Sequence, residues 1–282
     1  MSARELEDLG EGRILRSSSE GSGNVLLLFG EGADTKVLKL YRERRGRTKE
    51  VLSGFSHRMF EHKRGTRAKV RYRTECLTLD LWEHHGLDVF SRFSMPLPAG
   101  YAPPGLWFEY CEGDTVGSLV ENPEVDAARK HECLLRVGHA THTRHLLALE
   151  HGEPLLVQER GTLNHLFVSG ERLISFDFEG GFLAGFPVIE ALTQELAGLI
   201  RSINRRAGSA ELFEELVATF VQGYDDPALL RDIARWGVHH QSYYRRIRRW
   251  YDQRRRRSNT KTDGLRFLLS FLPQSTAAAE VD

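Results

Sequence analysis

Two neighbouring stretches decide how this chain can be interpreted: VQERGTLNHLFV at residues 157–168 and FDFEGG at residues 176–181. Asn164 follows a tight turn and leads into an apolar strand, and Asp177 lies at the end of the next apolar strand. A carboxylate beside an apolar strand is costly unless it binds a partner or a metal ion. An amide and a carboxylate at adjacent hairpin ends offer the hard oxygen ligands that Mg²⁺ prefers. The alternative is a pair of turn-forming residues.

The N-terminal region predicts a small antiparallel sheet. Polar turns separate apolar runs, which we expect to form strands at 12–17, 24–30 and 35–41. The turn before the second strand contains Gly21 and Gly23, which would let backbone N–H groups approach phosphate oxygens. A plain glycine-rich hairpin is the alternative.

The third expected strand alternates Val37, Lys39 and Tyr41 against Leu38 and Leu40. A lysine on a strand near a nucleotide could neutralise its phosphates. The alternative for Lys39 is an exposed lysine on the solvent face of a half-buried strand.

Two helices should follow, at about 48–63 and about 69–85, the second closed by Gly86. Glu75 lies early on the second helix and could pair with Lys39, or be an ordinary surface glutamate. FSMPLP (93–98) and LWFEYCEG (106–113) predict two further strands.

The second half predicts mainly helices, beginning with a long one at 125–149 that Gly138 interrupts. Short strands are expected in LLVQER, HLFVSG and RLISFDF, and helices again from about 187. The order is that of an α+β chain with a cleft between its halves. We expect a β-rich N-lobe at 1–112, a helical C-lobe at 113–273 and a polar tail at 274–282.

Composition restricts the class of protein. The 282 residues are 40 % hydrophobic and 28 % charged, and no apolar run reaches the length of about 18 residues that predicts a transmembrane helix. The N-terminus is too charged for a secretory signal. Cys76, Cys111 and Cys133 are odd in number and lack C-x-x-C spacing, which indicates neither a disulfide framework nor a zinc site. A reducing cytoplasm is the expected compartment.

Formal net charge is zero, yet residues 245–257 (RRIRRWYDQRRRR) hold eight arginines and one acid. Together with Tyr243 they predict a helix with an aromatic stripe and a basic remainder. Such a helix could dock on the C-lobe with its basic face solvated, lie on an anionic membrane surface, or contact nucleic acid. Between the membrane and nucleic acid, the membrane is favoured, with the helix lying at its inner face.

The ordered set of motifs resembles the protein-kinase-like fold over roughly residues 12–225. It is most similar to atypical bacterial kinases of the lipopolysaccharide core, the heptose and Kdo kinases, which resemble the RIO kinases and the small kinase of the KEOPS complex. The resemblance implies a two-lobed fold that binds ATP and Mg²⁺ in its interlobe cleft. It assigns phosphate contact to Lys39 with Glu75 as its helix partner, adenine contacts to the backbone of Glu109 and Cys111, and metal binding to Asn164 and Asp177.

The chain departs from the family pattern in both loops. Val157 replaces the usual histidine, Glu159 replaces the usual aspartate, and Glu179 replaces the glycine of the metal loop. Glutamate keeps the carboxylate but extends it by roughly 1 Å, a misplacement that can cost about a hundredfold in rate. With Glu159 as the catalytic base, the resemblance implies an ATP-dependent phosphotransferase. Its acceptor would be a hydroxyl, on a lipopolysaccharide-core sugar or a protein Ser/Thr. The alternatives are a pseudokinase that binds nucleotide or serves as an interaction module, and a nucleic-acid-associated regulator.

Three histidines cluster in GHATHTRH: His139, His142 and His145. Spacings of three residues place them near one helical face, where a metal site is conceivable. Because no further ligand is identifiable, polar surface and half-buried positions on a C-lobe helix are favoured.

Overall fold

The computed structural model describes residues 13–17, 24–43, 67–99, 104–240 and 261–272. These divide into two compact units, residues 1–112 with 174–181, and residues 113–173 with 182–282. The segment 174–181, which contains Asp177, therefore clusters with the N-terminal half of the chain and not with the residues on either side of it in sequence.

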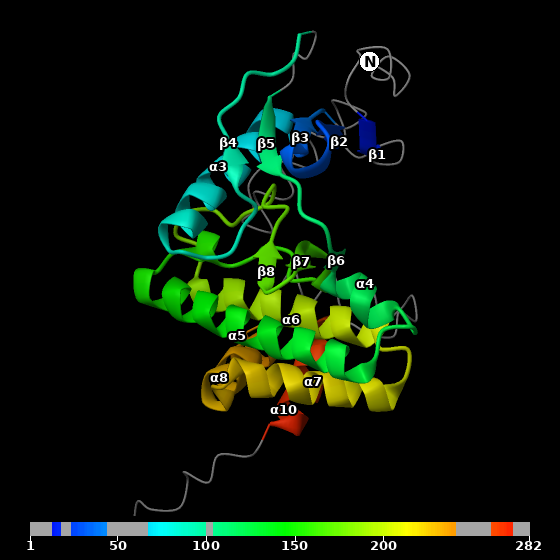
Figure 1. Cartoon of the computed structure of the whole chain (residues 1–282). Coiled ribbons are helices and arrows are strands. Elements are labelled where there is room, and N and C mark those ends of the chain that lie inside the picture. The colour runs from blue at the N-terminus through cyan, green and yellow to red at the C-terminus, as the bar shows by residue number, and fades with distance from the viewer. Residues whose placement is uncertain (1–12, 18–23, 44–66, 100–103, 241–260, 273–282) are drawn as a thin grey trace, which may run out of the picture. The chain divides into compact units, whose positions relative to one another are not determined.

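The first unit is built on an antiparallel sheet of five strands in the order β1-β2-β3-β5-β4 (Figure 1). A short 3₁₀ helix, η1, joins β2 to β3, and the long helix α3 lies between β3 and β4 in sequence. The elements are β1 (Arg13–Ser17), β2 (Asn24–Phe29), η1 (Gly32–Asp34), β3 (Lys36–Tyr41), α3 (Ala68–His84), β4 (Arg92–Phe93) and β5 (Gly105–Glu109).

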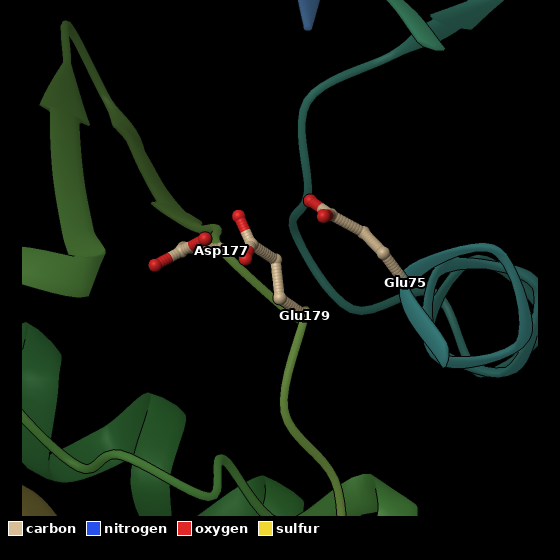
Figure 2. Close-up of side chains that lie close together, drawn as sticks. All are labelled: Glu75, Asp177 and Glu179. Carbon is tan, nitrogen blue, oxygen red and sulfur yellow. The ribbon is translucent and has the colours of Figure 1, made fainter. Parts of the chain in front are cut away.

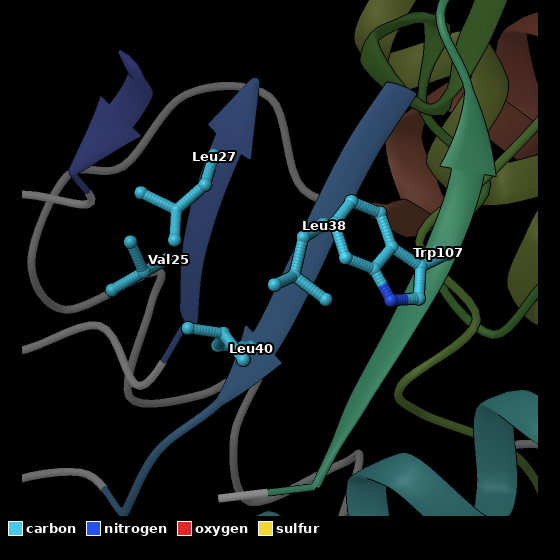
Figure 3. Close-up of a cluster of buried hydrophobic side chains, with 5 residues drawn as sticks. All are labelled: Val25, Leu27, Leu38, Leu40 and Trp107. Carbon is cyan, nitrogen blue, oxygen red and sulfur yellow. The ribbon is translucent and has the colours of Figure 1, made fainter. Parts of the chain in front are cut away.

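One face of this sheet carries an apolar cluster, drawn in Figure 3. The register pairs Val25 with Leu40 and Leu27 with Leu38, and Leu38 in turn with Trp107 on β5. Since side chains alternate between the faces of a strand, burying Leu38 and Leu40 on one side directs Lys39 to the other.

The second unit holds the remaining helices and most of a small sheet with the strand order β6-β7-β8, whose last strand continues into the 174–181 segment. Its elements are β6 (Asp114–Thr115), α4 (Val116–Glu121), α5 (Ala127–His151), η2 (Pro154–Leu156), η3 (Leu163–His165), β7 (Leu166–Ser169), β8 (Arg172–Ser175), α6 (Val188–Arg206), α7 (Ala210–Tyr224), α8 (Pro227–His239) and α10 (Lys261–Phe271).

The long helix α5 runs through Gly138 without a break, so the predicted interruption is wrong. A Cβ at Gly138 would come within 2.3 Å of the Phe220 carbonyl oxygen. The glycine therefore serves the close packing of α5 against α7, which lie side by side (Figure 1). None of the helices in the described residues is long and apolar enough to cross a membrane.

Two predicted strands differ from the structure. LLVQER forms the 3₁₀ helix η2 followed by a loop, because Pro154 starts the turn and the Glu153 carboxylate accepts the Leu155 N–H. FSMPLP contributes only Phe93 to β4, since prolines at 96 and 98 have no N–H to donate to a sheet.

The predicted fold class is otherwise confirmed as α+β, with a β-rich N-terminal unit and a helical C-terminal unit. The predicted helix at 48–63 lies outside the described residues.

Candidate functional site

The site begins with Lys39, which β3 holds on the face of the sheet opposite the apolar cluster. Lys39 is only 7 % exposed, so the alternative of a solvent-facing lysine does not hold. Its Nζ lies 2.7 Å from Glu75 Oε2 and 3.0 Å from Glu75 Oε1. Tyr41, on the same face, donates its hydroxyl to Glu75 Oε2 at 2.5 Å. The predicted Lys39–Glu75 ion pair is therefore present.

Helix α3 presents Glu75 to this lysine. Its first N–H, from Ala68, lies 3.3 Å from both carboxylate oxygens of Glu43, which provides one of the partners that a helix N-terminus lacks internally. Gly86, with φ +67°, follows the end of the helix in the left-handed conformation that favours glycine. Arg71 and Glu75 are four residues apart and thus share a helix face.

The loop after β8 brings two more carboxylates to Lys39. Asp177 has φ +66°, a left-handed conformation that is uncommon for residues other than glycine and that concentrates at functional sites. Asp177 Oδ1 lies 3.1 Å and Glu179 Oε1 lies 3.0 Å from Lys39 Nζ. Figure 2 shows both side chains extending from one loop beside Glu75 of the helix.

Apolar and backbone contacts hold this loop in place within the first unit. The Ser175 N–H donates to the Asp88 carbonyl at 3.0 Å, and Phe178 packs on Trp82 with ring centroids 4.6 Å apart. Because Trp82 lies on α3, the same helix supports the loop and supplies Glu75. The local conformation of Asp177 is therefore fixed by its neighbours on both sides.

The electrostatics favour a charged Lys39. Burial lowers the pKa of Lys39, but the carboxylates of Glu75, Asp177 and Glu179 outweigh it and raise the pKa overall. Burial raises the pKa of Glu75, and the negative charges of Asp177 and Glu179 add to this effect against the attraction of Lys39. Lys39 is thus a buried cation that several acids share.

These acids also fit a divalent cation. Within the described residues, Glu75, Asp177 and Glu179 each offer a ligand atom, and these atoms all lie within 4.8 Å of one another. Carboxylate oxygens are the ligands that Mg²⁺ prefers. Asn164, the other predicted metal ligand, belongs to the second unit, so its joint action with Asp177 stays a prediction.

Asn164 lies in η3 and is exposed to solvent. A Cβ on Gly117 would come 2.1 Å from Asn164 Oδ1, so only glycine fits at this position of α4 without moving the amide. This close approach restricts where the Asn164 side chain can lie.

The loop with Glu159, in the second unit, is hydrogen-bonded to a buried acid, Glu195, that was not predicted from the sequence. Val157 and Gln158 are buried, and the Gln158 N–H donates to Glu195 Oε2 at 3.3 Å. The side chain of Glu159 itself is 9 % exposed, with Oε2 3.6 Å from Arg160 Nε. Val157, which stands where the sequence resemblance led us to expect a histidine, is thus a buried apolar residue of this loop.

Glu195 on α6 is fully buried and holds two cationic or polar partners from α5. Arg144 donates to Glu195 Oε1, and His145 Nε2 lies 3.3 Å from Glu195 Oε2. His145 Nδ1 lies 2.8 Å from the hydroxyl of Tyr224. Burial lowers the pKa of His145, whereas the pKa of Glu195 is lowered because Arg144 and His145 outweigh its burial.

The predicted histidine cluster therefore spreads over three environments on α5. His139 is exposed, His142 is half-buried, and His145 is completely buried in the Glu195 network. The prediction of polar surface and half-buried positions is confirmed for His139 and His142. It is wrong for His145, whose two ring nitrogens contact Tyr224 and Glu195.

The structure describes only some of the residues predicted to contact the nucleotide. The backbone N–H of Glu109 donates to the Ser91 carbonyl at 2.9 Å, and its carboxylate accepts the Ser91 N–H at 2.8 Å. An adenine contact at Glu109 would therefore need a backbone group other than this N–H; Cys111 is partly buried. Gly21, Gly23 and the basic segment 243–257 lie outside the described residues.

Three residues of the Lys39 site were not predicted from the sequence. They are Glu179, which was expected only to replace a glycine, Arg71 and Asn24. Arg71 Nη1 lies 2.9 Å from Glu179 Oε2, and Asn24 donates to Glu179 Oε1 and accepts from Arg71. The signals were available: Arg71 lies one helical turn before Glu75, and Asn24 pairs with Tyr41 in the sheet register.

No protein-family model and no curated protein matches the chain. Among solved structures, WaaP in complex with acyl carrier protein is 11 % identical, with a TM-score of 0.44 over 83 % of this chain and 91 % of that one. The apo structure of a pseudokinase is 12 % identical, with a TM-score of 0.45 over 96 % of both chains. The order of its elements and its buried lysine–glutamate pair agree with the protein-kinase-like fold that the sequence resemblance predicts.

Proposed function

We propose that this chain is an ATP-dependent phosphotransferase whose acceptor is a hydroxyl group. The observation that carries the proposal is the buried Lys39 ammonium, held by Glu75 of α3 and by Asp177 in its left-handed conformation. A cation fixed in this way is suited to phosphate oxygens, and the adjacent carboxylates are suited to a metal ion. Lys39 would position the phosphates of ATP, while Asp177 and Asn164 would hold Mg²⁺, which offsets the charge on the phosphoryl group.

Glu159 is proposed as the catalytic base. The acceptor oxygen would attack the γ-phosphorus of ATP, its proton would pass to the Glu159 carboxylate, and the bond to the bridging oxygen of ADP would break. The Gln158–Glu195 hydrogen bond supports this assignment because it fixes the backbone directly before Glu159. A lipopolysaccharide-core sugar is the favoured acceptor from the sequence resemblance, and a protein Ser/Thr is the alternative.

A pseudokinase is the competing function, favoured by one specific observation: acids of the protein itself, Glu179 among them, surround Lys39. Such a protein would bind nucleotide weakly or serve as an interaction module without transferring phosphate.

Glu159→Gln separates the two functions. The enzyme proposal predicts measurable ATP turnover by the wild type, loss of turnover in Glu159→Gln, and nearly unchanged Mg-ATP binding. Glu150→Gln, an exposed position of α5, is the matched control and should behave as the wild type. Nucleotide binding without turnover in the wild type would leave the pseudokinase, and turnover by Glu159→Gln at the wild-type rate would exclude Glu159 as the base.

A further inference from the structure

The ammonium of Lys39 is fully engaged within the first unit. An ammonium group has three N–H donors. Lys39 Nζ lies within 3.1 Å of oxygens from three carboxylates, those of Glu75, Asp177 and Glu179. A phosphate oxygen that binds Lys39 must therefore displace at least one of them.

Glu179 has two further partners besides Lys39. Arg71 binds its second carboxylate oxygen, Oε2, at 2.9 Å, and Asn24 donates to Oε1. Arg71 is itself 2 % exposed and donates to the Arg42 carbonyl, which anchors it. The Glu179 carboxylate thus bridges two buried cations, Lys39 and Arg71.

The charges make this contact a competitor of phosphate. Three carboxylates face two cations, so an entering phosphate meets excess negative charge close by. Hydrogen bonds between ionised groups are among the strong ones, and the contacts of Glu179 to both Lys39 and Arg71 are of this kind. Moving Glu179 away from Lys39 breaks its contact with Lys39, while its contact with Arg71 keeps the carboxylate close to the site.

We infer that Glu179 occupies the phosphate-binding position on Lys39 and that Arg71 and Asn24 hold it there, so that the chain restrains its own nucleotide affinity. The inference rests on the proposed function, since it takes Lys39 as the phosphate ligand. It assigns to Glu179 a positioning and competing role, distinct from the metal-binding role proposed for Asp177.

The test is the affinity of the full chain for a fluorescent ATP analogue with Mg²⁺. Glu179→Gln keeps the shape of the side chain and removes its charge, and should tighten binding about tenfold, equivalent to about 1.4 kcal/mol. Asn24→Ala leaves the charge of Glu179 in place but removes one of the hydrogen bonds that hold its carboxylate, and should tighten binding by a smaller factor. Glu31→Gln, an exposed glutamate before η1, is the matched control and should leave the affinity unchanged.

A gain of affinity distinguishes the inference from a merely structural role, because loss of a structural contact would loosen the site and weaken binding. Unchanged or weaker binding in both variants, with a wild type that binds Mg-nucleotide, overturns the inference and leaves the proposed function standing. Should Glu179→Gln not fold, Asn24→Ala decides by the same criterion. Absence of binding in the wild type and both variants overturns the proposed function and this inference with it.

Discussion

The substitution Glu195→Gln should strongly destabilise the second unit. Glu195 is 0 % exposed, and its carboxylate binds Arg144, His145 and the N–H of Gln158. Gln keeps the shape but removes the negative charge that Glu195 places beside Arg144, which is 2 % exposed. Breaking a buried ion pair by removing one partner typically costs about 3–5 kcal/mol, since the remaining charge stays buried. At roughly 2–4 °C per kcal/mol for a unit of this size, the midpoint of thermal unfolding should fall by roughly 10 °C.

Thermal unfolding followed by circular dichroism and calorimetry measures this change. Glu214→Gln, an exposed glutamate on α7, is the control and should shift the midpoint by less than about 2 °C. Replacing both charges, as Glu195→Gln with Arg144→Met, should recover part of the loss because no uncompensated cation remains. A midpoint for Glu195→Gln within the range of the control would refute the claim that this buried ion pair stabilises the second unit.

Three further outcomes are expected. Burial lowers the pKa of His145 below its ordinary value of 6.5, so the unfolded state takes up a proton first as the pH falls. The free energy of unfolding, measured by denaturant titration, should therefore decline below about pH 6.5. His145→Gln should flatten this pH dependence, whereas His139→Gln, at an exposed position, should not. Gly117→Ala places a methyl group against Asn164 and should reduce ATP turnover by up to roughly a hundredfold, and full turnover would argue against a role for Asn164. Replacing the arginines 254–257 with glutamine should weaken binding to anionic liposomes, most strongly at low salt, whereas equal binding would leave only a solvated basic segment.

The sheet could be predicted because its strands follow from periodicity, whereas the pairing of Lys39 with Glu75 was assigned by the resemblance to the kinase-like fold. Alternation of apolar residues along β3 places Lys39 on the face opposite Leu38 and Leu40, but it leaves open whether that face is buried. A short apolar run such as LLVQER carries no such period. Its helix-or-strand choice depended on Pro154 and on the hydrogen bond from the Gln158 N–H to Glu195, a residue that lies far along the chain.

The role of Glu179 could not be predicted in the same way. Its partners Arg71 and Asn24 come from α3 and β2, and only the folded chain brings them to one carboxylate. The motif indicated that a glycine was missing, but not that the acid in its place binds Lys39.

Binding of a fluorescent ATP analogue to the wild-type chain, with and without Mg²⁺, tests most directly whether the Lys39 site holds a nucleotide. We expect binding that depends on Mg²⁺, that Asp177→Asn weakens, and that Asp34→Asn, an exposed aspartate of the same unit, leaves unchanged. A wild-type chain that binds no nucleotide with Mg²⁺, or an Asp177→Asn variant that binds as tightly as the wild type, would contradict the assignment of Lys39 and Asp177 to a nucleotide site.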